Sequence, residues 1–181
     1  FQLRQLRVVC RSLSPDVLKT LLHAFVTCRL DYCNSLLYGI PQCELKRLQA
    51  VQNAAARLLS RISRYDHITP VLRDQLHWLP VAERIDFKIA LLTFKSLHGM
   101  APTYLADMLH LTSDYDALAR NRSAAHGNLI CPSWNTSTYG RRGFMFAAPE
   151  IWNKLPTDVK CSDSISIFKK LLKTFFVPPS V

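Results

Sequence analysis

The chain has 181 residues, of which 49% are apolar, and its formal net charge at neutral pH is +10. This apolar fraction suffices for a packed core and excludes a wholly disordered chain, while the length predicts one domain or a helical unit with a small mixed unit. No run of about 18 apolar residues occurs, so we expect no membrane-spanning helix. The chain begins without Met and without a signal-peptide pattern, as expected for a fragment of a nuclear or cytoplasmic protein.

The first strong helix signal is Ser14-Pro15-Asp16. Ser can cap free backbone N–H groups, Pro fits the first helical position, and Asp meets the positive end of the helix dipole. We expect this helix to continue to about Tyr38, where Gly39 and Pro41 end it. Its predicted apolar stripe consists of Val17, Leu21, Phe25, Cys28, Tyr32 and Leu36.

A second helix is predicted from about Cys43 to Ile62, with one apolar face and one basic face. The apolar face consists of Leu45, Leu48, Val51, Ala55, Leu58 and Ile62. The basic face consists of Lys46, Asn53, Arg57, Arg61 and Arg64. Such a stripe can be an ordinary solvated face or can follow a phosphate backbone. The lack of an acid within it and the fit of Arg to phosphate favour the second reading, so these five residues are predicted nucleic-acid contacts.

The middle of the chain predicts further helices. A short one begins at Thr69-Pro70, and a longer one runs from Pro80 to His98 before Gly99. The turn between them carries Trp78, which we interpret as a core anchor rather than a base-stacking platform. Another short helix is expected from Pro102 to about Leu109.

The last third of the chain lacks the continuous helical periodicity of the first two thirds. The predicted domains are a helical one over 1–111, a polar linker over 112–127, and a small β-ribbon and helix region over 128–181. Short antiparallel strands are expected over 128–131, 136–139 and 143–147, followed by a helix from about Ser164. Arg141 and Arg142 would lie at a turn of this ribbon as further candidate nucleic-acid contacts. The predicted fold class is therefore mainly α with a small α+β element at the C-terminal end.

The cysteines and histidines give no sign of a catalytic or metal site. His23, Cys28, Cys33 and Cys43 lack the Cys-x2-Cys spacing of zinc sites. No histidine lies in a His-Glu-x-x-His or nucleophile motif. We therefore expect reduced cysteines, structural histidines, no catalytic residue and no bound metal.

Charge is distributed unevenly along the chain. Residues 1–64 contain ten Lys and Arg against three Asp and Glu, residues 65–120 five against seven, and residues 121–181 eight against three. A basic front and tail on a near-neutral middle are typical of a surface that contacts phosphates.

Ordered strings support one family resemblance over almost the whole chain. They are LDYCNSLLYGIP from Leu30, LQAVQNAAARL from Leu48, YDHITPVL from Tyr65, LHWLPVAERIDFK from Leu76, and the tail block with Thr138-Tyr139-Gly140, Ala147-Ala148-Pro149 and Trp152 to Pro156. With these strings the chain resembles the region that follows the polymerase core in non-LTR retrotransposon reverse transcriptases, of the LINE, Jockey and chicken-repeat type. It departs from that pattern at Arg141-Arg142-Gly143, after the tail glycine.

The resemblance implies a thumb domain and C-terminal extension without the catalytic palm. Polymerase chemistry needs clustered carboxylates for two metal ions, and the Tyr-x-Asp-Asp string of reverse transcriptases does not occur here. Mg²⁺ would therefore belong to the missing palm. The implied partners are an RNA template, a DNA primer and the fingers and palm of the same polyprotein. The implied function is to hold template and primer by their backbones during target-primed reverse transcription.

Two alternatives remain open from the sequence. A domesticated or relic fragment would act as a helical structural or protein-interaction domain, and its basic stripe would be buried or paired with acids. A sequence-specific helix-turn-helix binder would need a short recognition helix after a tight turn, which the long predicted helices disfavour.

Overall fold

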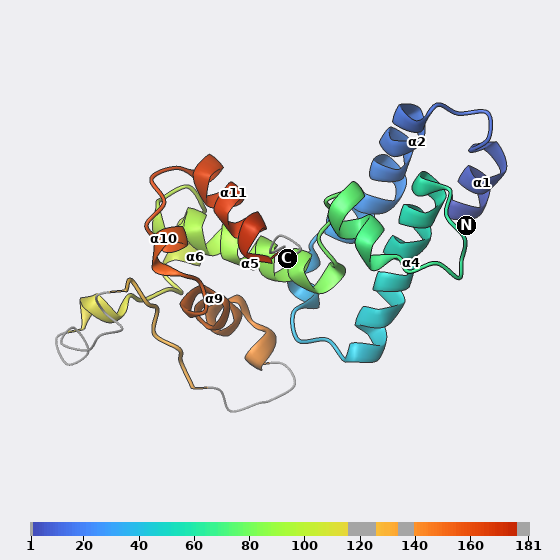
Figure 1. Cartoon of the computed structure of the whole chain (residues 1–181). Helices are drawn as coiled ribbons and strands as arrows, with labels where there is room; N and C mark the ends of the chain where they lie inside the picture. The colour runs from blue at the N-terminus through green and yellow to red at the C-terminus, as the bar shows by residue number, and fades with distance from the viewer. Residues whose placement is uncertain (1, 116–125, 134–139, 177–181) are drawn as a thin grey trace. The chain divides into compact units, whose positions relative to one another are not determined.

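The structure, a computed structural model, describes residues 2–115, 126–133 and 140–176 (Figure 1). It is mainly helical, as the sequence predicts. The longer helices are α1 (Gln2–Val9), α2 (Pro15–Leu22), α4 (Gln42–Ser60), α5 (Val81–Leu97), α9 (Phe144–Asn153) and α11 (Ile165–Phe176). Short helical turns are η1 (His23–Thr27), α3 (Cys28–Asp31), η2 (Asn34–Leu37), η3 (Val71–Gln75), α6 (Thr103–Ala106), η4 (Thr112–Asp114), η5 (Gly140–Arg142) and α10 (Thr157–Lys160).

The helices belong to two compact units. The N-terminal unit comprises residues 1–34 and 40–84, and the C-terminal unit comprises residues 35–39 and 85–181. The predicted domain boundaries, with a linker over 112–127, stay a prediction, because 116–125 lie outside the described residues.

The core of the N-terminal unit joins α1, α2 and α4 to the turn before α5. Leu22 and Ala56 are fully buried in it, and Leu6 of α1 packs in the same cluster. Trp78 is 7% exposed, and its ring meets His23 edge to face at 5.7 Å between centroids. The prediction that Trp78 is a core anchor is therefore confirmed.

The helix predicted from Ser14 begins as expected but ends early. The Ser14 hydroxyl accepts a hydrogen bond from the Val17 amide at 3.4 Å, so the predicted cap is confirmed. The helical run stops at Asp31, not at Tyr38, because Tyr32 is extended and Cys33 is left-handed with φ 49°. A tertiary ion pair lies at this break. The Asp31 carboxylate accepts a hydrogen bond from Arg84 Nε at 2.8 Å and pairs with the rest of that guanidinium.

The predicted apolar stripe of this helix is wrong by one position. Leu18, Leu22 and Val26 are buried, whereas Val17, Phe25, Tyr32 and Leu36 are 42–80% exposed. Apolar pairs such as Val17-Leu18 and Phe25-Val26 give two stripes of equal period, so periodicity alone cannot choose between them.

The C-terminal unit is built on the second part of α5. Its bounds, Val81–Leu97 with Gly99 at φ 67°, confirm the helix predicted between Pro80 and Gly99. Phe94 of α5 stacks on Phe168 of α11 at 4.3 Å between ring centroids, and Trp152 of α9 lies 6.0 Å from Phe168. These rings form the centre of this unit.

The predicted antiparallel ribbon is not found among the described residues. Residues 143–147, expected as a strand, lie largely in α9, where Ala147, Ala148, Ile151 and Trp152 are buried at helical spacing. The run Phe-Met-Phe-Ala-Ala suits either period, and Pro149 is unusual inside a helix, so the sequence signal was ambiguous. Residues 128–131 contribute one isolated antiparallel bridge, between Leu129 and Leu111. The third expected strand, 136–139, lies outside the described residues.

Candidate nucleic-acid interface

A basic groove lies on the N-terminal unit, between the end of α1 and the end of α4. Its volume is about 730 Å³. We call it the arginine groove. Its lining consists of Arg7, Cys10, Arg11, Arg57, Leu58, Arg61, Ile62 and Arg64.

Two chain segments bring these arginines to the groove. Arg57 lies in the last turn of α4, and Arg61 is the residue at which that helix ends. Arg7 lies near the end of α1, and Arg11 lies in the turn that follows it. Leu6 holds α1 in the same core as Ala55 and Ala56 of α4. The charged ends of the two helices are therefore brought together by burial of the apolar residues beside them.

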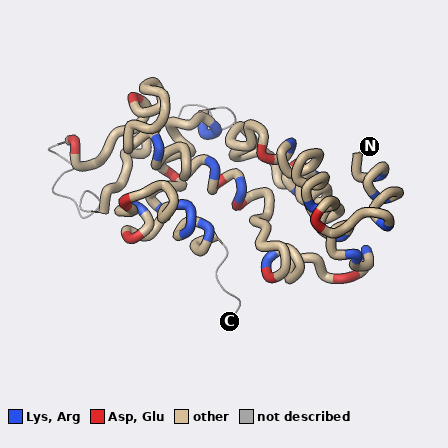
Figure 2. Tube along the Cα trace, turned by 90° about the horizontal axis from the view of Figure 1, so that it is seen from above, with Lys and Arg blue, Asp and Glu red and all other residues tan. Residues whose placement is uncertain are grey.

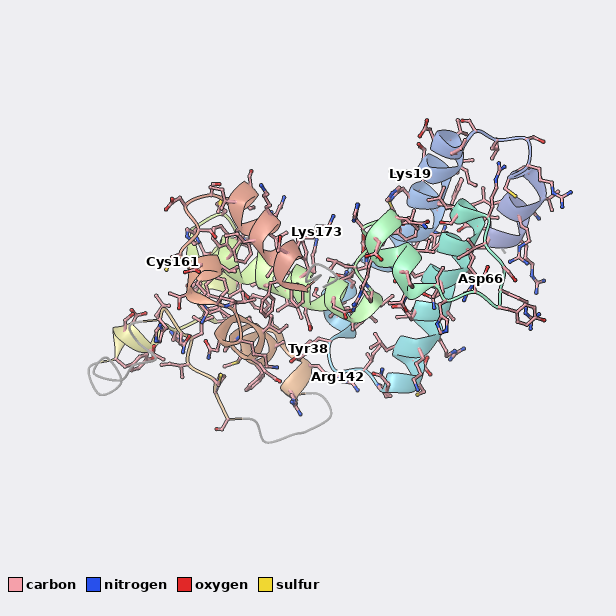
Figure 3. All side chains as sticks on the ribbon, in the orientation of Figure 1. Lys19, Tyr38, Asp66, Arg142, Cys161 and Lys173 are labelled. Carbon is pink, nitrogen blue, oxygen red and sulfur yellow. The ribbon has the colours of Figure 1, made fainter. Side chains whose placement is uncertain are left out.

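The end of α4 turns the chain so that Arg64 also joins the groove. Arg61 adopts the left-handed conformation with φ 53° that commonly ends a helix. In the turn that follows, the Ser63 amide donates to the Asp66 carboxylate at 2.8 Å. The Arg57 guanidinium donates to the Asp66 backbone carbonyl at 3.3 Å, tying this turn to α4. Figure 3 labels Asp66 in this turn.

The charge of the groove is not neutralised by acids. No Asp or Glu lines it. Among the residues that the structure describes, none of its five arginines takes part in an ion pair. The nearest acid in sequence, Asp66, uses its carboxylate for the backbone of its own turn. Five guanidinium groups around one concave surface favour a polyanionic ligand, because Arg binds phosphate oxygens with two parallel N–H groups.

An exposed aromatic ring continues this surface. Tyr65 is 82% exposed, and the Arg64 guanidinium lies over its ring at 5.0 Å from the centroid. The Tyr65 amide donates to the Ser63 hydroxyl at 3.3 Å, so the ring projects from the hydrogen-bonded turn.

Two of the predicted contacts on α4 lie elsewhere. Lys46 is exposed in the first half of the helix and does not line the arginine groove. Asn53 is half-buried, and its side-chain carbonyl accepts a hydrogen bond from Gln49 at 2.9 Å. The structure thus brings Arg57, Arg61 and Arg64 together and leaves Lys46 and Asn53 apart from them.

Arg141 and Arg142 belong to the C-terminal unit, in the turn η5 before α9. Arg141 pairs with Glu150 at 3.3 Å. The Arg142 side chain packs over Gly39, so near that a Cβ there would meet Arg142 Cγ at 3.2 Å, and Figure 3 shows Arg142 beside Tyr38. Both arginines therefore have intramolecular roles in addition to their charge.

Glu150 is the electrostatic centre of that cluster. Burial opposes its ionisation, but hydrogen bonds from Arg141, Tyr38 and Lys154 outweigh burial and hold the pKa of Glu150 below its usual value. Burial and the neighbouring Glu150 charge raise the pKa of Tyr38 well above its usual range. Arg141 is thus partly neutralised, which lowers its value as a phosphate contact relative to the arginine groove.

Arg7 and Arg11 were missed by the sequence reasoning. The segment Phe1 to Arg11 carries arginines at positions 4, 7 and 11, a helical spacing that could have revealed a second basic face. Figure 2 shows Lys and Arg recurring along the helix at the N-terminal end. That this face meets the end of α4 depends on tertiary packing.

The described part of the chain contains neither a cluster of metal ligands nor a membrane-spanning helix. No group of three His, Cys, Asp or Glu lies close enough there to hold a metal ion. All six cysteines are free thiols. Within the same residues, no helix has the length and apolar character needed to cross a membrane.

No protein family, curated protein or solved structure matches the chain. The two features that bear on function are therefore the arginine groove and the sequence strings.

Proposed function

We propose that this chain is a nucleic-acid-binding, non-catalytic part of a reverse transcriptase of the non-LTR retrotransposon type. It holds the RNA template and DNA primer by their phosphates, and the fingers and palm of the same polyprotein supply catalysis and Mg²⁺. The polymerase context rests on the ordered strings from Leu30 to Pro156 alone. The proposal that the chain binds nucleic acid is supported by a feature of the structure, the arginine groove.

The arginine groove supports this function through its composition. Five arginines with no lining acid make a surface that attracts a polyanion and reads no base sequence. Sequence-independent backbone contact is what a protein that moves along a template and primer needs. The structural-domain alternative predicts a buried or acid-paired basic stripe, whereas Arg61 and Arg64 are exposed and have no ion pair with a described residue.

A second candidate function, protein interaction, is favoured by a smaller apolar groove on the same unit. It has a volume of about 370 Å³ and is lined by Leu3, Phe25, Val26, Leu30, Leu48 and Val51, with Gln2 and Arg29. Phe25 and Val51 are 42% and 40% exposed. Of the described residues that line this apolar groove, Arg29 is the one with a charge, whereas five arginines line the arginine groove. The apolar groove therefore suits an apolar protein segment, and the arginine groove suits a polyanion.

The test is a salt titration of binding to an RNA–DNA hybrid with a single-stranded template overhang, followed by fluorescence anisotropy. We expect log affinity to fall linearly with log salt concentration, with a slope of about 0.7–0.9 per phosphate contacted. The variant Arg7→Gln/Arg61→Gln/Arg64→Gln should bind more weakly and with a slope shallower by about 2–3, because three contacts are lost.

The control variant removes the same charge from other exposed positions of the same unit. Arg4→Gln/Lys19→Gln/Arg47→Gln has the same net charge, but none of these residues lines the arginine groove. It should keep most of the affinity and of the slope. Equal losses in both variants would mean that net charge alone drives binding. Absence of binding at low salt by a folded protein would refute the proposed function and favour the protein-interaction candidate.

A further inference from the structure

We propose that the arginine groove binds a single strand of nucleic acid, and that the ring of Tyr65 is a stacking surface for one of its bases. This inference rests on the proposed function and specifies its ligand: the unpaired part of the template rather than the duplex. It follows from three features of the groove: its floor, its aromatic neighbour and the rigidity of the turn that carries that neighbour.

The lining of the groove is partly apolar and partly charged. Leu58, Ile62 and Cys10 are half-buried and line the groove together with the arginines, and we call these three side chains its apolar floor. A volume of about 730 Å³ is in the range of sites that enclose a small ligand, roughly 300–1,000 Å³. A duplex hides its base faces and offers phosphates on a convex surface, so it would touch the arginines and leave this floor empty. A single strand can place sugars and bases on the apolar floor and phosphates on the arginines.

Tyr65 supplies the aromatic surface that single-strand sites use. It is 82% exposed, and its own unit covers it with little besides the Arg64 guanidinium. An aromatic ring beside a basic groove offers its face to any base, because every base has a π-face, and such stacking contributes about 1–3 kcal/mol per base. The guanidinium that already lies on the ring also belongs to the groove, so ring and groove form one continuous surface.

The turn that carries Tyr65 is tied down before any ligand arrives. The Asp66 amide donates to the Ser63 carbonyl at 3.3 Å, and the Ser63 amide donates to the Asp66 carboxylate at 2.8 Å. The Arg57 guanidinium donates to the Asp66 carbonyl at 3.3 Å and thereby joins the turn to α4. A ring on a turn whose backbone is already ordered loses less backbone conformational entropy on binding than one on a loose loop. An acidic protein segment would also pair with the arginines, but its carboxylate side chains have no flat face to stack on the ring, whereas every base has one.

The experiment compares three probes with the full chain at one salt concentration: a single-stranded oligonucleotide, a blunt hybrid duplex of the same length, and an abasic strand with the same phosphates. We expect the single strand to bind more tightly than either of the others. Tyr65→Ala should weaken single-strand binding by about 5- to 150-fold, the equivalent of one stacked base, and leave duplex binding unchanged. Tyr65→Phe should stay within about twofold of the wild type, because the ring is kept.

Tyr32→Ala is the matched control, because Tyr32 is 80% exposed on the same unit and does not line the arginine groove. It should leave binding of all probes unchanged. If duplex and single strand bind equally, and Tyr65→Ala changes neither while the groove variant weakens both, the single-strand inference is wrong and the proposed function stands. If no nucleic acid binds, or if only an acidic polypeptide such as polyglutamate binds, the proposed function fails as well.

Discussion

Gln52 is a polar side chain in the core of the N-terminal unit, and its hydrogen bonds join α4 to the turn before α5. It is 2% exposed, and its amide donates to the Leu79 carbonyl at 2.8 Å. Its own carbonyl accepts from Gln49 at 2.9 Å, and Gln49 in turn accepts from the Val81 amide at 2.8 Å. The two glutamines thus satisfy backbone groups on both sides of Pro80, where no helical partner exists.

Gln52→Ala should lower the free energy of unfolding by about 1–3 kcal/mol. The substitution leaves the Leu79 carbonyl buried without a donor and deprives Gln49 of an acceptor, and unsatisfied buried polar groups have about that cost. Denaturant unfolding followed by circular dichroism measures the change. Gln42→Ala, at an exposed position of the same helix, should stay within about 0.5 kcal/mol of the wild type. A Gln52→Ala protein as stable as the wild type would show that this network does not stabilise the fold.

At the scale of elements, α4 presents two faces with separate tasks. Gln52, Ala55 and Ala56 are its buried residues, and Arg57 and Arg61 face the arginine groove. The predicted apolar face is confirmed at Ala55, which is buried, and at Leu58 and Ile62, which are partly buried against the same core. Val51 is 40% exposed, and the neighbouring Gln52 is buried in the core in its place. The helix ends at Ser60 because Arg61 turns left-handed, which also starts the turn that carries Tyr65.

Arg61→Gly should separate binding from folding. A left-handed residue other than Gly is strained, and Gly is the usual residue at this place, so the substitution should raise the free energy of unfolding by up to about 1 kcal/mol. It also removes one guanidinium from the groove, so affinity for the template–primer probe should fall. Thermal unfolding and anisotropy on the same sample measure both effects. A variant that is less stable than the wild type, or that binds equally well, would contradict this account of Arg61.

At the scale of the whole molecule, the net charge affects association with polyanions in general, whereas the location of the charges decides where a binding site forms. The charge of +10 favours association with any polyanion, but only a concentration of cations in one place gives a defined site. The N-terminal unit has such a place in the arginine groove, whereas Arg141 in the C-terminal unit shares Glu150 with Lys154.

Ligand binding should stabilise the N-terminal unit, which carries the groove, by mass action. A single strand at 100 times its dissociation constant should add about 2.7 kcal/mol to the free energy of unfolding of that unit, seen as a rise in the midpoint of its thermal unfolding. The rise should disappear at high salt and in the Arg7→Gln/Arg61→Gln/Arg64→Gln variant. Stabilisation that persists in that variant would place the ligand outside the arginine groove.

Local signals in the sequence determined much of the fold. The Ser14 cap, the α5 helix ended by Gly99 and the mainly helical class were predictable, because capping, periodicity and helix stops act over a few neighbouring residues. Part of the groove was predictable for the same reason, since Arg57, Arg61 and Arg64 are close in sequence.

Tertiary structure alone decided the rest. Asp31, where the helix breaks, pairs with Arg84, more than fifty residues away, and the choice of Leu18 over Val17 for the core depends on which face α4 covers. The meeting of Arg7 and Arg11 with the end of α4 depends on burial of Leu6 beside Ala55. A sequence pattern specifies which faces are apolar or basic. Which faces meet depends on packing between distant segments, and therefore the arginine groove became complete only in the folded unit.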